Sequence, residues 1–405
     1  MIATLALLVI VAACAALLFL KGTLAQGLVM IFNLLVAGFI AFGFFELLTP
    51  YLIKYSPGVA PWAPMICFLA LLLVAFALLQ AAAMQLSAKH KVDFGPLPEQ
   101  IGRPVAGAIL GYFVTGHLLV AAAMAPLPTD YPYPRFDERN PNPARPAKPL
   151  LNPDGAVTGL FATVSKGSFG ALKDPRSFAV LHAGYVDQLY LNRQKIAGEV
   201  PLMTSTPALE VPRKDGVWYA PESLRDTEGK PLATQPGASL MLVRVGIKTG
   251  ALKEAAKFSL SQIRLICGPK TGVPNPLLGA GQAVYPIGFI GSNSRLERKS
   301  LAEIIAIDPA KVQGDAVMMD LAFHVPTNAV PVLLEFKRNN VVQVSAPAAS
   351  ENAPQPIPFG SAPAAPPEPE APAPQAAQPA PAPDDQRQGR GLSDFSRSIV
   401  GDQEN

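Results

Sequence analysis

The chain has 405 residues, of which 50% are hydrophobic and 16% are charged, and its formal net charge is +3. It lacks the glycine period of collagen, and three cysteines are too few for a disulfide-rich scaffold. The small net charge, with no basic stripe, argues against nucleic acid as a partner. Apolar residues gather in the N-terminal third and prolines near the C-terminus, so a free-standing soluble enzyme is excluded.

Four long apolar runs fill the N-terminal third. They are Ile2–Leu20, Leu28–Leu48, Trp62–Leu86 and Pro104–Ala125. Each supplies the ~20 helical residues that cross ~30 Å of hydrocarbon, where the backbone must bond to itself. The first run has no basic stretch before it and no small-residue cleavage site after it, so we expect it to be retained as a span. Residues 1–127 are therefore predicted to form an all-α module of four transmembrane helices in the inner (plasma) membrane.

Positive residues in the short connectors indicate which side of such a module faces the cytoplasm. The first and third connectors carry Lys21, Lys89, Lys91 and Arg103, and the second carries only Lys54. This count places both termini outside the cytoplasm. The stretch after the fourth run lies on the same side as the second connector and adds Arg135, Arg139 and Arg145, so that each side then carries four cations. Charge alone leaves the orientation open.

Glycines recur along the fourth run, at Gly102, Gly107, Gly111 and Gly116. Small residues one turn apart let two helix backbones approach closely in lipid. The pattern favours helix packing among the four spans of one chain, with homo-oligomerisation through this face as the alternative.

Asn33 lies inside the second run, Glu46 lies near the end of that run, and His117 is the one titratable group of the fourth run. An ionisable group at that depth is a candidate for a proton or ion path, as in an exporter or channel. Transporters usually carry several such groups, and no Asp, Lys or Arg accompanies His117 inside a span. A neutral imidazole bonded to a neighbour such as Asn33 explains the residue equally well.

The four runs, the glycines of the first connector and the stretch IGRPVAGAILGYFVTGHLLVAAAMAPL resemble the colicin V production (CvpA-like) membrane family. The match covers about residues 1–127, with Lys21-Gly22 in place of the Arg-Gly that is frequent there. The resemblance implies a place in the cell envelope and a link to toxin export, without an established reaction. Some relatives carry an extracytoplasmic protease domain after this module, which favours both termini outside.

The region behind the module changes character twice. Residues 128–153 are rich in proline, which disfavours helix and central strand, so they are predicted to form a semi-rigid extended spacer. Residues 154–237 are predicted to be mixed helix and loop, packing on the next domain. Apolar residues at helical spacing between Pro175 and Lys195 predict a helix there, and 199–237 is loop-rich.

Residues 238–345 alternate apolar and polar side chains with a period of two. About seven short strands without intervening helices predict an antiparallel, immunoglobulin-like β-sandwich. Its clearest strand runs from Val317 to Val325, and a phase slip between Leu260 and Ile263 suggests a bulge. Phe323, Val325 and Pro326 resemble the F-x-V-P step of DUF4352-type extracytoplasmic domains.

Residues 346–405 form an acidic, proline-rich stretch that is predicted to be disordered. Leu392, Phe395 and Ile399 could form a docking helix for a partner, although chance spacing explains them as well.

No catalytic constellation is apparent in the sequence, so we expect no enzyme activity. The turn Gly291–Ser294 lacks the glycines that flank a hydrolytic serine, and no CxxC, HxH or HExxH motif predicts a metal. The sequence contains no phosphate-binding loop motif, so we expect no nucleotide cofactor. The sequence favours an envelope scaffold, or a secretion-associated protein, with an extracytoplasmic binding domain. Its expected partners are the bilayer, a second copy, or another envelope protein; an exporter or channel component is the alternative.

Overall fold

The computed structural model describes residues 2–87, 94–166, 177–194, 200–312 and 314–359. The chain divides into two units, Met1–Pro363 and Ala364–Asn405. All described residues belong to the first unit, and the proposed docking helix at Leu392 lies outside them.

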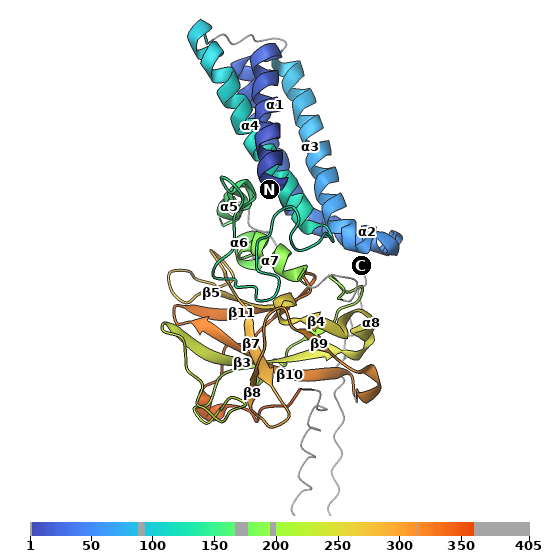
Figure 1. Cartoon of the computed structure of the whole chain (residues 1–405), viewed down its shortest axis with the longest axis vertical. Coiled ribbons are helices and arrows are strands. Elements are labelled where there is room, and N and C mark those ends of the chain that lie inside the picture. The colour runs from blue at the N-terminus through green and yellow to red at the C-terminus, as the bar shows by residue number, and fades with distance from the viewer. Residues whose placement is uncertain (1, 88–93, 167–176, 195–199, 313, 360–405) are drawn as a thin grey trace, which may run out of the picture. The chain divides into compact units, whose positions relative to one another are not determined.

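Four long helices make up the N-terminal third (Figure 1). They are α1 (Ile2–Lys21), α2 (Leu24–Tyr55), α3 (Ala63–Ser87) and α4 (Pro96–Met124). Each is long and apolar enough to cross a membrane, which confirms the four predicted spans. Helix α1 packs on α4, and α2 packs on both α3 and α4.

Helix α2 is longer than the sequence predicts. It starts at a capping box formed by Thr23 and Gln26 and continues through Pro50 to Tyr55. A proline inside a helix removes one backbone bond and bends the axis, and Figure 1 shows the labelled end of α2 turned away from the direction of α3. The extra turns bring Lys54 to the β domain.

The predicted extended spacer is wrong, because residues 128–153 fold back into the molecule. Tyr133 and Arg135 are each only 5% exposed. A helix that the sequence did not predict, α5 (Pro153–Ser165), then packs against α4. Buried hydrogen bonds explain why prolines do not keep this stretch extended: Tyr133 donates to Asp154, and Arg135 donates to Tyr133 and Asp187.

The helix predicted between Pro175 and Lys195 is broken in two. Its ends lie outside the described residues, and the middle forms α6 (Phe178–Leu181) and α7 (Tyr185–Asn192). Gly184, between them, has a φ of +61°, a left-handed value that glycine adopts at little cost. The break turns the chain and exposes the carbonyl groups of Leu181 and Ala183 to side chains of the sheet.

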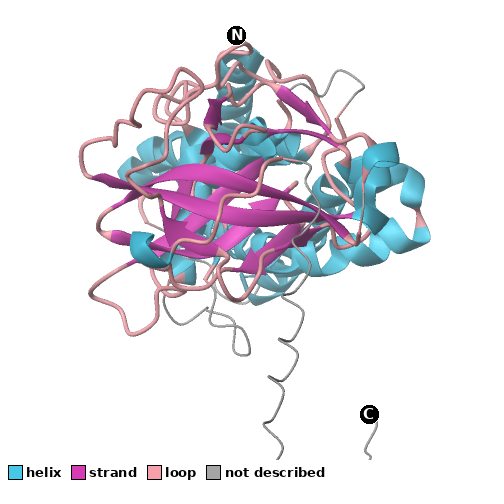
Figure 2. Cartoon of the chain, turned by 90° about the horizontal axis from the view of Figure 1, so that it is seen from below, coloured by secondary structure: helices cyan, strands magenta, loops and turns pink. Residues whose placement is uncertain are grey.

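Residues 209–343 form an antiparallel β-sandwich, as predicted. One sheet has the order β1-β3-β10-β7-β8, with β2 also beside β3, and the other has the order β12-β11-β5-β6. Figure 2 shows the strands in magenta, gathered in the middle of the view. The strands are β1 (Leu209–Glu210), β2 (Val217–Tyr219), β3 (Ala238–Lys248), β5 (Ile263–Pro269), β6 (Gln282–Val284), β7 (Pro286–Ile290), β8 (Leu296–Arg298), β10 (Ala316–Pro326), β11 (Ala329–Phe336) and β12 (Asn340–Gln343), and the short pair β4 (Lys257–Ser259) and β9 (Ile304–Ala306) completes them.

The core lies between the two sheets. Inward residues of β3 and β10, such as Val245 and Phe323, pack in one cluster with residues of β5 and β11, such as Leu265 and Phe336. The turn after Pro326 carries the chain from one sheet to the other, because β10 and β11 belong to different sheets.

Two details of the predicted sandwich need correction. The region predicted as loop-rich contributes β1 and β2 to the first sheet. The phase slip after Leu260 is a 3-10 turn (Leu260–Gln262) that separates β4 from β5, and not a bulge within one strand.

The chain stays on the sandwich beyond residue 345, where we expected disorder to begin. Asp320, on the outer face of β10, is fully buried. It binds Arg244 at 2.9 and 3.0 Å and accepts the backbone N–H of Ile357 at 2.7 Å. Phe359 then packs on the core. Residues 346–359 therefore cover a face that strand periodicity alone predicts to be exposed.

Candidate functional site

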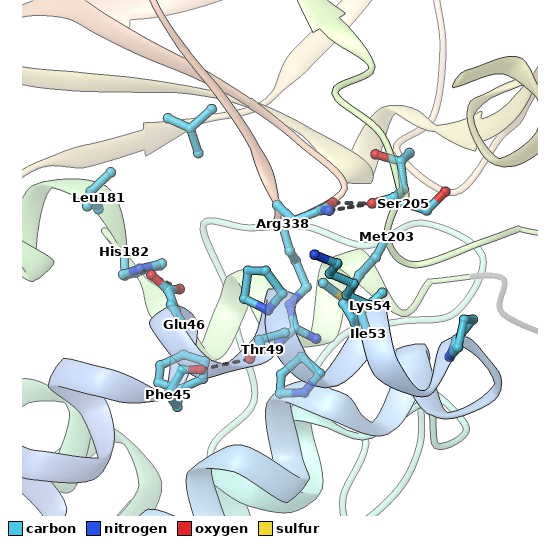
Figure 3. Close-up of a pocket in the computed structure, with 16 residues that line it drawn as sticks. Phe45, Glu46, Thr49, Ile53, Lys54, Leu181, His182, Met203, Ser205 and Arg338 are labelled. Atoms are coloured by element: carbon cyan, nitrogen blue, oxygen red, sulfur yellow. Dashed lines mark hydrogen bonds and ion pairs between the residues drawn. The ribbon is translucent and has the colours of Figure 1, made fainter. Parts of the chain in front are cut away.

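A cavity of about 660 Å³ lies where α2 meets the β domain (Figure 3). One face of α2 forms its first wall, with Glu46, Thr49, Ile53 and Lys54 at helical spacing. The sequence placed Glu46 near the end of an apolar run and Lys54 in a connector. The structure adds that both lie on the helix face that turns toward the soluble domain.

The opposite wall comes from two loops. The segment Met203–Ser205 forms one part, and the turn between β11 and β12 forms the other. In that turn Lys337 and Arg338 both have positive φ, at +48° and +64°. Non-glycine residues rarely adopt this conformation, and it persists only where surrounding contacts hold it. Here it sends Lys337 into the sandwich and Arg338 toward the helices.

A chain of polar contacts leads from the cavity into the sandwich. His182 Nε2 lies 3.0 Å from Glu46 Oε1, and His182 Nδ1 lies 3.4 Å from Gln188 Oε1. Gln188 donates in turn to Glu335 on β11. The ring of His182 is thus held between a helix of the membrane module and the β domain.

Arg264 on β5 fixes the far end of this chain. It binds Glu335 at 2.6 and 2.8 Å, and the side chains of both residues are only 3% exposed. The same guanidinium donates to the carbonyls of Ala183 and Leu181, at 2.7 and 2.8 Å. These bonds satisfy the backbone at the break between α6 and α7, and so they position His182 in the cavity.

Two arginines cap the C-terminal end of α4. Arg193, fully buried, donates to the carbonyls of Ala122 at 3.2 Å and Tyr131 at 2.9 Å, and its guanidinium lies 4.4 Å from the Tyr190 ring centroid. Arg338 donates to the carbonyl of Met124 at 3.2 Å. The last carbonyls of a helix lack internal partners and carry partial negative charge, so both cations are favourable there. Burial lowers the pKa of Arg193 to about 10, which leaves it charged at neutral pH.

The predicted packing glycines lie against segments of the same chain. A Cβ added at Gly107 would lie 2.5 Å from Ala15 Cα, and one at Gly111 would lie 2.7 Å from Val11 Cα, both on α1. Gly116 faces the first turn of α5, and Gly102 faces the side chain of Leu24. The α4 face that carries Gly107 and Gly111 is thus occupied by α1.

The predicted polar pair of the membrane module is not brought together. Asn33 donates to Gln80 on α3 at 3.0 Å. His117 is bonded through Nδ1 to the Phe113 carbonyl at 2.8 Å, and the rings of Phe42 and Phe68 lie 6.2 and 6.4 Å from its ring. Each therefore has a local partner, and among the described residues no hydrogen bond joins Asn33 to His117.

The sequence did not indicate that Arg193, Arg338 and His182 belong together, because they reach the junction between the helices and the β domain only through tertiary packing. The one available signal was Glu46, an acid inside an apolar run. Within the described ranges, no group of three or more His, Cys, Asp and Glu residues could hold a metal ion.

Comparisons with known proteins found no matching protein-family model, curated protein or solved structure.

Proposed function

We propose that this chain is a multi-pass scaffold of the cell inner membrane, with a CvpA-like helical module that holds a β-sandwich on the extracytoplasmic side as a binding domain. The observation that carries the proposal is the capping of α4 by Arg193 and Arg338. A domain bonded to the end of a spanning helix is held at a fixed place on the membrane surface. Rigid presentation of this kind suits a scaffold better than it suits an enzyme on a flexible tether.

The folded arrangement also supports the extracytoplasmic orientation. Arg135 is buried and bonded to Asp187 at 2.5 Å, so it belongs to the folded domain and not to a short connector. Charges in folded domains weigh little in setting topology, whereas those of short loops weigh most. With the later arginines set aside, four cations in the first and third connectors stand against Lys54. The end of the module with Lys21 and Arg103 then faces the cytoplasm.

A C-terminal reporter tests the orientation directly. Alkaline phosphatase fused after Asn405 is expected to be active, and green fluorescent protein at the same point is expected to be dark after Sec-dependent export. The reverse pattern would place the sandwich in the cytoplasm and end the proposal.

Site-specific photo-crosslinking tests the scaffold role. Gln282 is exposed on β6, an edge strand of the second sheet, and edge strands are frequent recognition surfaces. A photoreactive residue at Gln282 is expected to give discrete adducts with envelope proteins in living cells. The same probe at Lys230, exposed at a different loop, serves as the control. Identical adduct patterns at both positions would argue against a dedicated binding surface.

A further inference from the structure

The cavity between α2 and the sandwich combines apolar walls with cations that face into it. Phe45, Ile53, Pro57 and Met203 supply apolar surface. Lys54 and Arg338 are the cations among the lining residues, and Figure 3 shows them on neighbouring sides of the same space. Glu46 is the carboxylate of the lining, and it already lies 3.0 Å from His182. Two cations against one engaged carboxylate leave the cavity with a preference for an anion.

The position of the cavity suggests where the anion comes from. It lies at the C-terminal end of a spanning helix, where Tyr51 and Tyr55 are 63% and 79% exposed. Exposed aromatic residues at the end of a span are typical of the headgroup level of a bilayer. Arg338 donates one N–H to the Met124 carbonyl, and a guanidinium has five N–H donors. It therefore retains donors suited to a phosphate group.

We infer that this cavity binds the phosphate headgroup of an anionic phospholipid, with Lys54 and Arg338 as the phosphate ligands and the apolar walls against the start of the acyl chains. The backbone at Arg338 is left-handed, and its guanidinium reaches the end of α4 and lines the cavity beside α2. The inference rests on the proposed membrane placement of the helices, and it does not require the β domain to bind a protein partner. A bound lipid would join the helical module to the β domain.

Native mass spectrometry of the full-length protein in detergent tests the inference. Phosphatidylglycerol is titrated against the wild-type protein, Lys54→Ala, Arg338→Ala and the double variant. Affinity is expected to fall roughly fivefold for each cation removed. Lys21→Ala removes a cation at the end of the helical module that lies away from the cavity, and this variant is expected to bind the lipid as the wild type does. Equal binding by the wild type and the double variant would overturn the inference.

Further arms separate the source of the phosphate and guard against misfolding. Phosphatidylcholine and glycerol phosphate are titrated in parallel, and both are expected to bind more weakly than phosphatidylglycerol. Glycerol phosphate that bound as tightly would indicate a soluble ligand, and phosphatidylcholine that bound as tightly would indicate no charge selection; either result overturns the lipid assignment. Ile53→Trp places a bulkier side chain on the apolar wall while keeping both cations, and it is expected to weaken binding even if Arg338→Ala fails to fold.

Discussion

At the residue scale, the buried cations bear most directly on how the helical module and the β domain are joined. Arg193 is fully buried, and within the described part of the chain its charge is offset by backbone carbonyls and by the ring of Tyr190 and not by a carboxylate. Burying a charge is costly unless hydrogen bonds compensate for it. Arg193 therefore depends on the end of α4 being in place, and α4 depends on Arg193 for its last carbonyls.

Replacing Arg193 by Met should destabilise the protein by about 2 kcal/mol, because carbonyls bonded to a charged donor are left without it. The measurement is the thermal unfolding midpoint in detergent, which should fall by several degrees. Arg213→Met, at an exposed loop position, is the control and should leave the midpoint unchanged. An unchanged midpoint for Arg193→Met would show that the cap contributes nothing.

Lys337 is expected to make the stability of the protein depend on pH. Burial lowers its pKa to about 7, against an ordinary value of 10.5, although its Nζ donates to the carbonyls of Glu254 and Lys257. Between these two values the unfolded chain binds more protons than the folded one, so stability rises with pH. The contribution of Lys337 should grow by about 2 kcal/mol from pH 7 to pH 9. Denaturant unfolding at the two pH values should show this gain in the wild type and lose it in Lys337→Met.

At the scale of the elements, close backbone contact between α1 and α4 defines the helical module. The glycines allow it, because a Cβ at Gly107 or Gly111 would meet the α1 backbone and not a movable side chain. In lipid such contact replaces the hydrophobic drive that packs helices in water.

Gly107→Leu should therefore separate α1 from α4 and lower the unfolding midpoint in detergent. Overpacking of this kind typically costs about 1–3 kcal/mol. Gly43→Leu is the matched control, since a Cβ there meets no atom of the described residues within 4 Å. Normal stability of Gly107→Leu combined with loss of a dimer would instead favour the oligomer interpretation of the glycines.

The elements also show where sequence reasoning succeeds and where it stops. Apolar length alone predicts all four spans, because lipid leaves a chain no alternative to helix. Period-two alternation predicts β3 and β10 because their inward residues share one core. The α6–α7 break and the folded stretch around Tyr133 could not be predicted, because buried polar bonds to distant residues decide them. The cavity is missed for the same reason: its walls meet only after folding.

At the scale of the whole first unit, the β-sandwich is docked on the membrane helices and not tethered to them. Arg338 in the β11–β12 turn bonds to α4 directly. His182 and Arg193, at the ends of α6 and α7, contact α2 and α4, and Arg264 of the sheet bonds to the turn between α6 and α7. Glu46 and His182 meet across this junction at 3.0 Å.

Cross-linking of Glu46→Cys with His182→Cys in native membranes tests the claim most directly, with Cys14, Cys67 and Cys267 replaced by Ala and a protease site introduced after Asn142. A short thiol cross-linker should keep the two fragments joined on a denaturing gel after cleavage. Glu46→Cys paired with Lys230→Cys is the negative control. Joined fragments for the first pair alone are the predicted result, and fragments that separate in both pairs would contradict the docked arrangement.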